Sequence, residues 1–298
     1  MKTFISTVLA LVFFSISAFA DNVEREFRMT GYYGIKASHQ FNIVVRKGND
    51  PTIKVSCPQE LETYLDIKQD KETLILSFNK SFTEKVSHLF DSNRKGKATQ
   101  VQVTLEMPEL NSIELSGSCS LKTEGDFRTG AFVFDISGAC DANVSVNAMK
   151  LRGDASGSSE LTVNGHFDII TCKSSGSSSV TLNSHCSDLN LEFSGSSVTR
   201  YNGDVDDTAT IKASGSSDSY LAGSATMVII QASGTAMVDA KGLDAPEAEV
   251  KASGVSKVFV YASKKLSMHA NMTSKITYYG KPAEIQTENG GKRYVAGE

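Results

Sequence analysis

The chain combines 298 residues with a formal net charge of −4, five cysteines and no tryptophan. A small negative charge over this length excludes a nucleic-acid binder that works through phosphate contacts, so we expect no nucleic-acid partner. The chain is long enough for a sizeable core or for an elongated stack of repeats.

Residues 1–20 have the pattern of a secretory signal peptide. Lys2 gives a basic start, an apolar stretch runs from Phe4 to Ile16, and the small residues Ala18 and Ala20 fit a cleavage site. The apolar stretch is too short for a comfortable membrane span, and no second one follows it in the sequence. We therefore expect cleavage after Ala20 and an exported protein without a membrane span, located in the periplasm, on the cell surface or outside the cell.

Residues 21–108 are rich in strand-forming residues but contain no Ser-Gly pair. We interpret them as irregular β-coils that cap a stack of repeats. The stretch near 81–97 departs from the strand pattern, because residues 81–84 resemble a helix capping box and residues 94–97 are basic. We expect a helix or ordered loop there. Its candidate partner surface consists of Phe82, Val86, Leu89, Arg94, Lys95 and Lys97.

Residues 109–298 carry the strongest signal, a repeat marked by eight Ser-Gly pairs. Successive glycines are 21, 19, 19, 19, 20, 19 and 20 residues apart, and such a fixed period is typical of a solenoid. The column four residues before each glycine is almost wholly apolar, and the next column is polar, which predicts a strand there. The eight glycines are Gly117, Gly138, Gly157, Gly176, Gly195, Gly215, Gly234 and Gly254.

Each repeat therefore predicts a strand, a Ser-Gly corner, a second strand and a second turn. Glycine adopts positive φ without a steric clash, so we expect each repeat glycine at a corner that requires it. Parallel strands joined in this way predict an all-β fold, a right-handed parallel β-solenoid with coils of about 19–20 residues. The stretch at 271–276 parallels the last Ser-Gly coil without its glycine, and it predicts a degenerate terminal coil.

Two cysteines share one position of the repeat. Cys119 and Cys140 each follow a repeat glycine by two residues, so stacked coils would place their α-carbons about 5 Å apart, within disulfide range. Alternatively, they fill a row of small residues that continues with Ser159, Ser178 and Ser197. Because five is an odd number, at least one thiol is free or pairs between chains.

Two histidines also share a repeat position. His166 and His185 lie nine residues after successive glycines, in the column of Asp204. A row of such side chains about 4.8 Å apart is a candidate metal site, although turn positions are ordinarily polar in any case. No motif indicates a cofactor, and we expect none.

A third constellation lies in the polar column before the glycines, where Asp135, Asp154 and Lys173 are neighbours. Lyases and hydrolases with a β-helix fold build sites from carboxylates and a basic residue on such a face. Opposite charges along a ladder also form a plain solvated, salt-bridged face. A carbohydrate-active enzyme is therefore an alternative function, and a structural periplasmic protein without a ligand is another.

The entry into the repeats resembles a known family. Met107-Pro108-Glu109-Leu110-Asn111-Ser112-Ile113, followed by Leu115-Ser116-Gly117-Ser118 and the later Ser-Gly pairs, is similar to the putative auto-transporter adhesin, head GIN domain family. The resemblance covers about residues 27–280 and implies a β-solenoid of the Gram-negative envelope, with no established catalytic residues. We interpret the chain as a non-enzymatic protein that presents an extended surface for adhesion or envelope-associated binding, its partner a surface glycan or protein.

Overall fold

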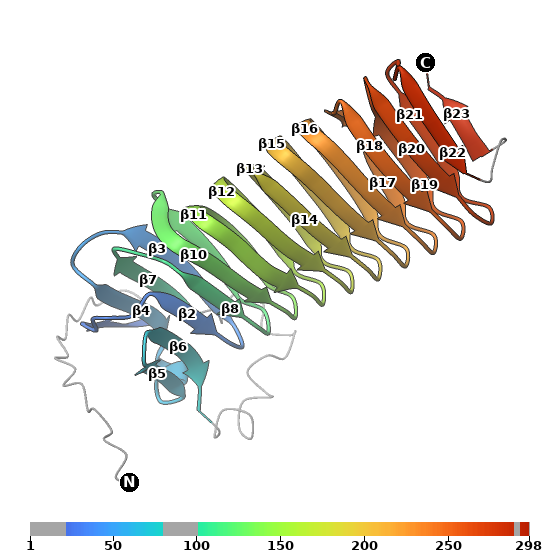
Figure 1. Ribbon diagram of the computed structural model, residues 1–298. Coiled ribbons are helices and arrows are strands. Elements are labelled where there is room, and N and C mark those ends of the chain that lie inside the picture. The colour runs from blue at the N-terminus through green and yellow to red at the C-terminus, as the bar shows by residue number, and fades with distance from the viewer. Residues whose placement is uncertain (1–21, 80–100, 289–292, 298) are drawn as a thin grey trace, which may run out of the picture.

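The computed structural model describes residues 22–79, 101–288 and 293–297. Their strands form one 23-stranded sheet that winds into an elongated β-solenoid (Figure 1). The fold class predicted from the Ser-Gly period is thus confirmed, while the right hand of the coil stays a prediction. The signal peptide at 1–20 and the candidate partner surface from Phe82 to Lys97 lie outside the described residues.

Seven strands and one short helix precede the regular repeats: β1 (Asn22–Phe27), β2 (Gly34–Ala37), β3 (Phe41–Lys47), β4 (Thr52–Pro58), α1 (Gln59–Glu62), β5 (Leu65–Asp70), β6 (Thr73–Phe78) and β7 (Val101–Met107). The repeats contain β8 (Ser112–Leu115), β9 (Ser120–Glu124), β10 (Phe127–Ile136), β11 (Asp141–Ala155), β12 (Glu160–Ser174), β13 (Ser179–His185), β14 (Asp188–Phe193), β15 (Val198–Ala213) and β16 (Asp218–Ala232). They end with β17 (Met237–Asp244), β18 (Glu247–Ala252), β19 (Lys257–Tyr261), β20 (Lys265–Ala270), β21 (Lys275–Tyr279), β22 (Glu284–Glu288) and β23 (Tyr294–Ala296). In the part of the chain described, no helix is long and apolar enough to cross a membrane.

Each coil has a strand that leads into the corner and a strand that leaves it, and both pair in parallel with the next coil. β15 and β16, for example, pair from Val198↔Asp218 to Ala213↔Ala232. Buried and exposed residues alternate along the strands, so one set of side chains fills the interior while the other forms rows on the surface. Every surface residue therefore lies about 4.8 Å from its equivalent in the next coil.

Ten residues with left-handed backbone mark the corners in successive coils. The eight repeat glycines have φ between +67° and +80°, and His39 and Met272 occupy the same position at the two ends with φ of +80° and +57°. The degenerate terminal coil thus keeps the corner conformation without its glycine. Next to this column, buried serines close six of the corners: Ser197 Oγ, for example, donates a hydrogen bond to the carbonyl oxygen of Ser194 at 2.9 Å.

The N-terminal cap differs from the simple coils expected for residues 21–108. The coil made of β2 and β3 lies between the coil of β8 and β9 and the coil of β6 and β7, so spatial order departs from chain order. Beyond the outermost coil, β4 pairs antiparallel with β7, β1 with β4, and β5 with β6. These antiparallel strands cover the open edge of the stack, which would otherwise expose unpaired backbone groups.

Candidate functional site

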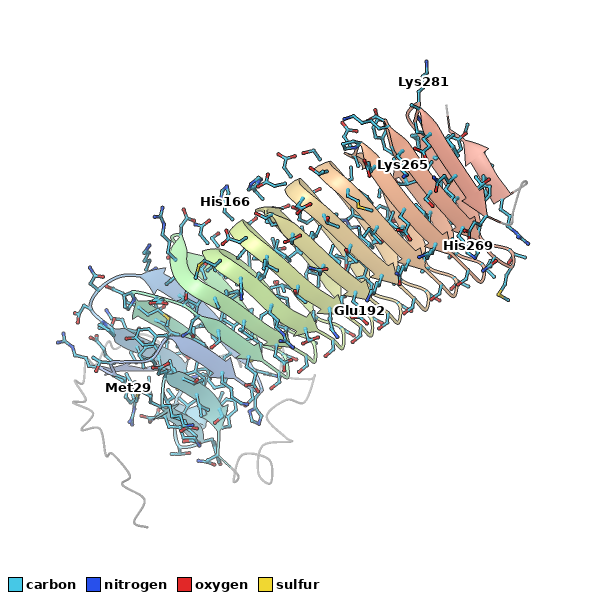
Figure 2. The ribbon with its side chains drawn as sticks, in the orientation of Figure 1. Met29, His166, Glu192, Lys265, His269 and Lys281 are labelled. Carbon is cyan, nitrogen blue, oxygen red and sulfur yellow. The ribbon has the colours of Figure 1, made fainter. Side chains whose placement is uncertain are left out.

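One surface row runs the whole length of the solenoid, three residues before each corner. We call it the polar row, and each of its members pairs in register with the next. The polar row consists of Lys36, Glu114, Asp135, Asp154, Lys173, Glu192, Lys212, Gln231, Lys251, His269 and Glu288. Figure 2 shows Glu192 and His269 along the edge where the corners line up.

Ion pairs neutralise most of this row. Lys173 Nζ lies 3.3 Å from Glu192 Oε2, and Lys251 Nζ lies 2.7 Å from Glu249 Oε1 on its own strand. The hydrogen bond with Glu249 raises the pKa of Lys251 above its ordinary value. Such exposed pairs contribute little to stability. Within the described residues Lys212 has no ion pair, so its ammonium group is available to a ligand.

A groove of about 440 Å³ follows the polar row across five coils. Polar side chains form one edge of the groove, and corner residues form the other: Glu192, Lys212, Gln231, Lys251 and His269 face Ser214, Ser233, Ser253 and Asn271. Phe193 and three alanines lie between the two edges. Ala213, Ala232 and Ala252 are buried, so no long side chain projects between the two edges of the groove.

The groove offers hydrogen-bonding groups of several kinds. It combines hydroxyl, amide, ammonium and imidazole groups at a repeat of about 4.8 Å. At its C-terminal end His269 Nδ1 lies 3.2 Å from Glu288 Oε2, and Asn271 Nδ2 lies 2.8 Å from His269 Nε2. Sequence reasoning identified the polar column but missed the groove, because its second edge is set by how far the corner serines project. The signal that could have found it is the juxtaposition of two polar columns around a column of alanines.

The candidate metal residues are brought together only in part. The rings of His166 and His185 lie 6.2 Å apart between centroids. His166 Nδ1 lies 3.2 Å from Asn147 Oδ1, and His185 Nε2 lies 3.3 Å from Asp206 Oδ2. Asp204 instead accepts a hydrogen bond from Ser224 Oγ at 2.7 Å. Among the residues described, no group of three or more His, Cys, Asp or Glu could hold a metal ion.

The two repeat-position cysteines do lie on neighbouring coils. Both are buried free thiols, with the Cys119 N–H donating to Cys140 Sγ at 3.3 Å and Cys119 Sγ–H donating to the Ser116 carbonyl oxygen at 3.3 Å. The neighbouring Cys119, through its thiol and its backbone N–H, lowers the pKa of Cys140 to about 7, and the contact between the two thiols together with burial raises the pKa of Cys119. The disulfide between them stays a prediction.

The acidic residues of the alternative enzyme site stand in single file. Asp135, Asp154 and Lys173 are consecutive members of the polar row, each on its own coil. A glycosidase places its two carboxylates on opposite sides of the scissile bond, whereas these two project from one row in the same direction. Their stacking suits a solvated ladder better than a catalytic pair.

Together the long rows, the open groove and the repeated corners define the class of this molecule: a β-solenoid whose surface is an extended array of polar side chains. A family model described as "Putative auto-transporter adhesin, head GIN domain" matches residues 31–203 and 175–282. The chain belongs to this family. The comparison with curated proteins found no match.

Solved structures of similar proteins include three from Parabacteroides species. A putative adhesin from Parabacteroides merdae is 15% identical, covers 92% of this chain and 93% of its own, and has a TM-score of 0.54. Two structures from Parabacteroides distasonis have lower scores. A putative lipid binding protein is 14% identical over 94% of this chain and 98% of its own, with a TM-score of 0.48. A putative adhesin is 16% identical over 93% and 94%, with a TM-score of 0.45. The Parabacteroides merdae structure supports the shared solenoid fold.

Proposed function

We propose that this chain is an exported, non-enzymatic β-solenoid that uses the groove beside the polar row for adhesion or for binding within the cell envelope. The observation that carries the proposal is the groove itself, which crosses five coils from Glu192 to His269. An open, repetitive groove suits an extended partner, a surface glycan or a protein segment, because the same contacts recur in each coil. Membership in a family of adhesin-like proteins supports an exported location and a binding role.

The test combines a binding screen with a groove variant. The exported chain is screened against surface glycans and envelope proteins, and hits are repeated with Lys212→Glu/Lys251→Glu. The matched control is Lys150→Glu/Lys264→Glu, which makes the same charge change at exposed lysines outside the groove. We expect the groove variant alone to lose about tenfold or more in affinity. Equal binding by all three proteins would overturn the groove as the binding site.

Two further measurements separate the remaining alternatives. Surface labelling of intact cells distinguishes a surface adhesin from a periplasmic structural protein, which would stay unlabelled. Incubation with acidic polysaccharides tests the enzyme alternative, which requires chain cleavage that disappears in Asp154→Asn.

The segment at 81–97 stays a second predicted partner surface. Its deletion should weaken binding of any partner that uses it while leaving binding at the groove unchanged.

A further inference from the structure

The strands that leave the corners carry their own surface, which we call the post-corner face. Its first row lies three residues after each corner and pairs in register from coil to coil. In order from the N-terminal end, the row reads Asn42, Ser120, Asp141, Glu160, Ser179, Val198, Asp218, Met237, Lys257 and Lys275. The row is acidic toward its N-terminal end and basic at its C-terminal end.

Like charges lie directly opposite each other at both ends. Asp141 pairs in register with Glu160, and Lys257 pairs in register with Lys275. All four side chains are exposed, and none of them has an ion pair within the residues that the structure describes. Like charges at adjacent positions of a sheet are destabilising. A partner that carries the opposite charges in the same spacing would remove both repulsions.

We infer that this partner is a second copy of the chain, and that the post-corner faces of two copies pack together as a two-fold dimer. A rotation of 180° about an axis parallel to the strands reverses the order of the coils and keeps the rows aligned. With the axis between the coils of Val198 and Asp218, the partner's Lys275 lies opposite Asp141 and the partner's Lys257 lies opposite Glu160. A two-fold interface uses the same patch on both copies, so each charge match occurs twice.

The second row of the face obeys the same symmetry. Five residues after the corner, Arg200 and Tyr220 lie in adjacent coils, with the guanidinium 5.4 Å from the centre of the ring. The rotation brings Arg200 opposite the partner's Tyr220, which continues a favourable cation–π contact across the interface. It also places Thr181 opposite the partner's Asp239 and Thr162 opposite the partner's Phe259. No like charges meet among these matches.

Apolar and aromatic side chains lie between the charged ends of the face, and two further aromatic side chains, Phe259 and Tyr261, lie on the strand of Lys257. Val198 and Met237 are half-buried, Tyr220 is 37% exposed, and Phe259 and Tyr261 are half-buried. Aromatic residues near the centre of a patch with a polar rim are typical of protein interfaces. The strip from Asp141 to Lys275 spans eight coils, so at about 4.8 Å per coil and 3.3 Å per residue it covers roughly 700–800 Å². A stable interface buries about 800 Å² per partner, which this strip approaches.

The dimer would leave the groove free. The groove lies before the corners and the proposed interface lies after them, on different strand faces of each coil. Two antiparallel copies would therefore present two grooves, which raises the avidity for a long or repetitive partner. The inference concerns self-association and stands whether or not the groove binds a glycan.

Charge reversal gives a sharp test, because the side chains involved are exposed. One variant carries Lys257→Glu/Lys275→Glu, so that both ends of its row are acidic. The other carries Asp141→Lys/Glu160→Lys, so that both ends are basic. Sedimentation of the chain should show a dimer for the wild type, and the affinity of this dimer should fall as the salt concentration rises. Each variant alone should dimerise with an affinity about tenfold or more lower than that of the wild type. An equimolar mixture of the two variants should form a heterodimer.

The control Lys150→Glu/Lys264→Glu matches the first variant in charge and should stay dimeric. Circular dichroism checks that each variant is folded. A wild type that is monomeric at all concentrations, or folded variants that fail to associate when mixed, would overturn the inference. The inference would also be overturned if a polyanion bound the wild type at Lys257 and Lys275 while the chain remained monomeric. The partner of this face would then be an acidic ligand and not a second copy of the chain.

Discussion

Gly195 lies so close to Gly176 of the preceding coil that a β-carbon on Gly195 would be 2.7 Å from the Gly176 carbonyl oxygen and 2.8 Å from its nitrogen. The same contact recurs along the column, for example between Gly254 and Gly234. At Gly195, in the middle of the stack, the corner therefore favours glycine for two reasons, the positive φ and the close approach of the neighbouring backbone.

Gly195→Ala should destabilise the middle of the stack. The left-handed backbone alone costs a non-glycine residue about 1–3 kcal/mol, and the contact with Gly176 adds to this. Because solenoid stability depends on contacts between neighbouring coils, the loss should appear in the unfolding of the whole stack. Urea denaturation monitored by circular dichroism measures it.

The matched control is Met272→Ala in the terminal coil. Met272 already combines a side chain with a φ of +57°, so truncation of this 70% exposed side chain should change the midpoint little. If the two variants shifted the unfolding midpoint by equal small amounts, the steric requirement at Gly195 would be refuted.

The buried serine row predicts how two opposite substitutions change the stability of the stack. Ser197 Oγ donates to the Ser194 carbonyl oxygen at 2.9 Å, so Ser197→Ala should cost about 1 kcal/mol of unfolding free energy. Ala236 occupies the same row one corner after Ser217 and lacks the hydroxyl. Ala236→Ser should therefore add the missing bond to the Ser233 carbonyl and raise the midpoint or leave it unchanged. A loss of stability in Ala236→Ser would show that the hydroxyl row does not stabilise the corners.

Tyr201 predicts a pH dependence. Its buried hydroxyl donates to the carbonyl oxygens of Ser184 at 2.9 Å and Asp204 at 3.2 Å. Burial raises the pKa of Tyr201 well above its ordinary value of 10.0. The folded state therefore keeps a proton that the unfolded chain releases, and this contribution to stability is full below pH 10 and declines as the pH rises above it.

Tyr201→Phe isolates this effect. The variant should be less stable than the wild type by about 1 kcal/mol at neutral pH, because two buried carbonyls lose a donor. Above pH 10 the difference should narrow, since only the wild type loses the contribution of Tyr201. Denaturation at pH 7, 9 and 10.5 measures it. A difference that stayed constant over this range would contradict the assignment.

The repeat period made most of the fold predictable. Side chains that alternate around a fixed glycine leave one arrangement of strands and corners, and the φ values from Gly117 to Gly254 agree with the expected positive-φ corners. The order of the N-terminal coils was not predictable, because β2 and β3 insert between two later coils that are consecutive in the sequence, and no period marks this. The sequence also did not indicate which serine donates to the corner carbonyls. In the structure this donor is the serine two residues after the corner glycine, and the serine directly before the glycine supplies the carbonyl.

The partner of His185 shows a finer limit. Counting residues from the repeat glycines places His185 beside Asp204. In the structure, however, His185 Nε2 lies 3.3 Å from Asp206 Oδ2. At the second turn of the coil, the direction of each side chain depends on backbone angles that vary between coils. Register alone therefore predicts which residues are near one another, and it does not predict which pair bonds.

The last prediction concerns Cys119 and Cys140, whose thiols stack on adjacent coils. Contact with Cys119 lowers the pKa of Cys140 to about 7, which favours the Cys140 thiolate as the nucleophile once an oxidant reaches this buried pair. The Cys140 thiolate attacks oxidised glutathione, which gives a mixed disulfide and releases one reduced glutathione. Cys119 then loses its proton and attacks the Cys140 sulfur, which releases the second reduced glutathione and leaves the Cys119–Cys140 disulfide. Burial raises the pKa of Cys57, Cys172 and Cys186, which should keep them as thiols.

Thiol titration of the protein in denaturant should therefore find three free thiols among the five cysteines. Reduction should restore all five and lower the unfolding midpoint, since a disulfide that closes a loop of this size contributes about 3 kcal/mol. Cys140→Ser is the matched control. Serine is common at this position of the repeat, so the variant should fold and should lose the difference between oxidised and reduced protein. Five free thiols after folding in an oxidising buffer would show that the two cysteines only fill the small-residue row.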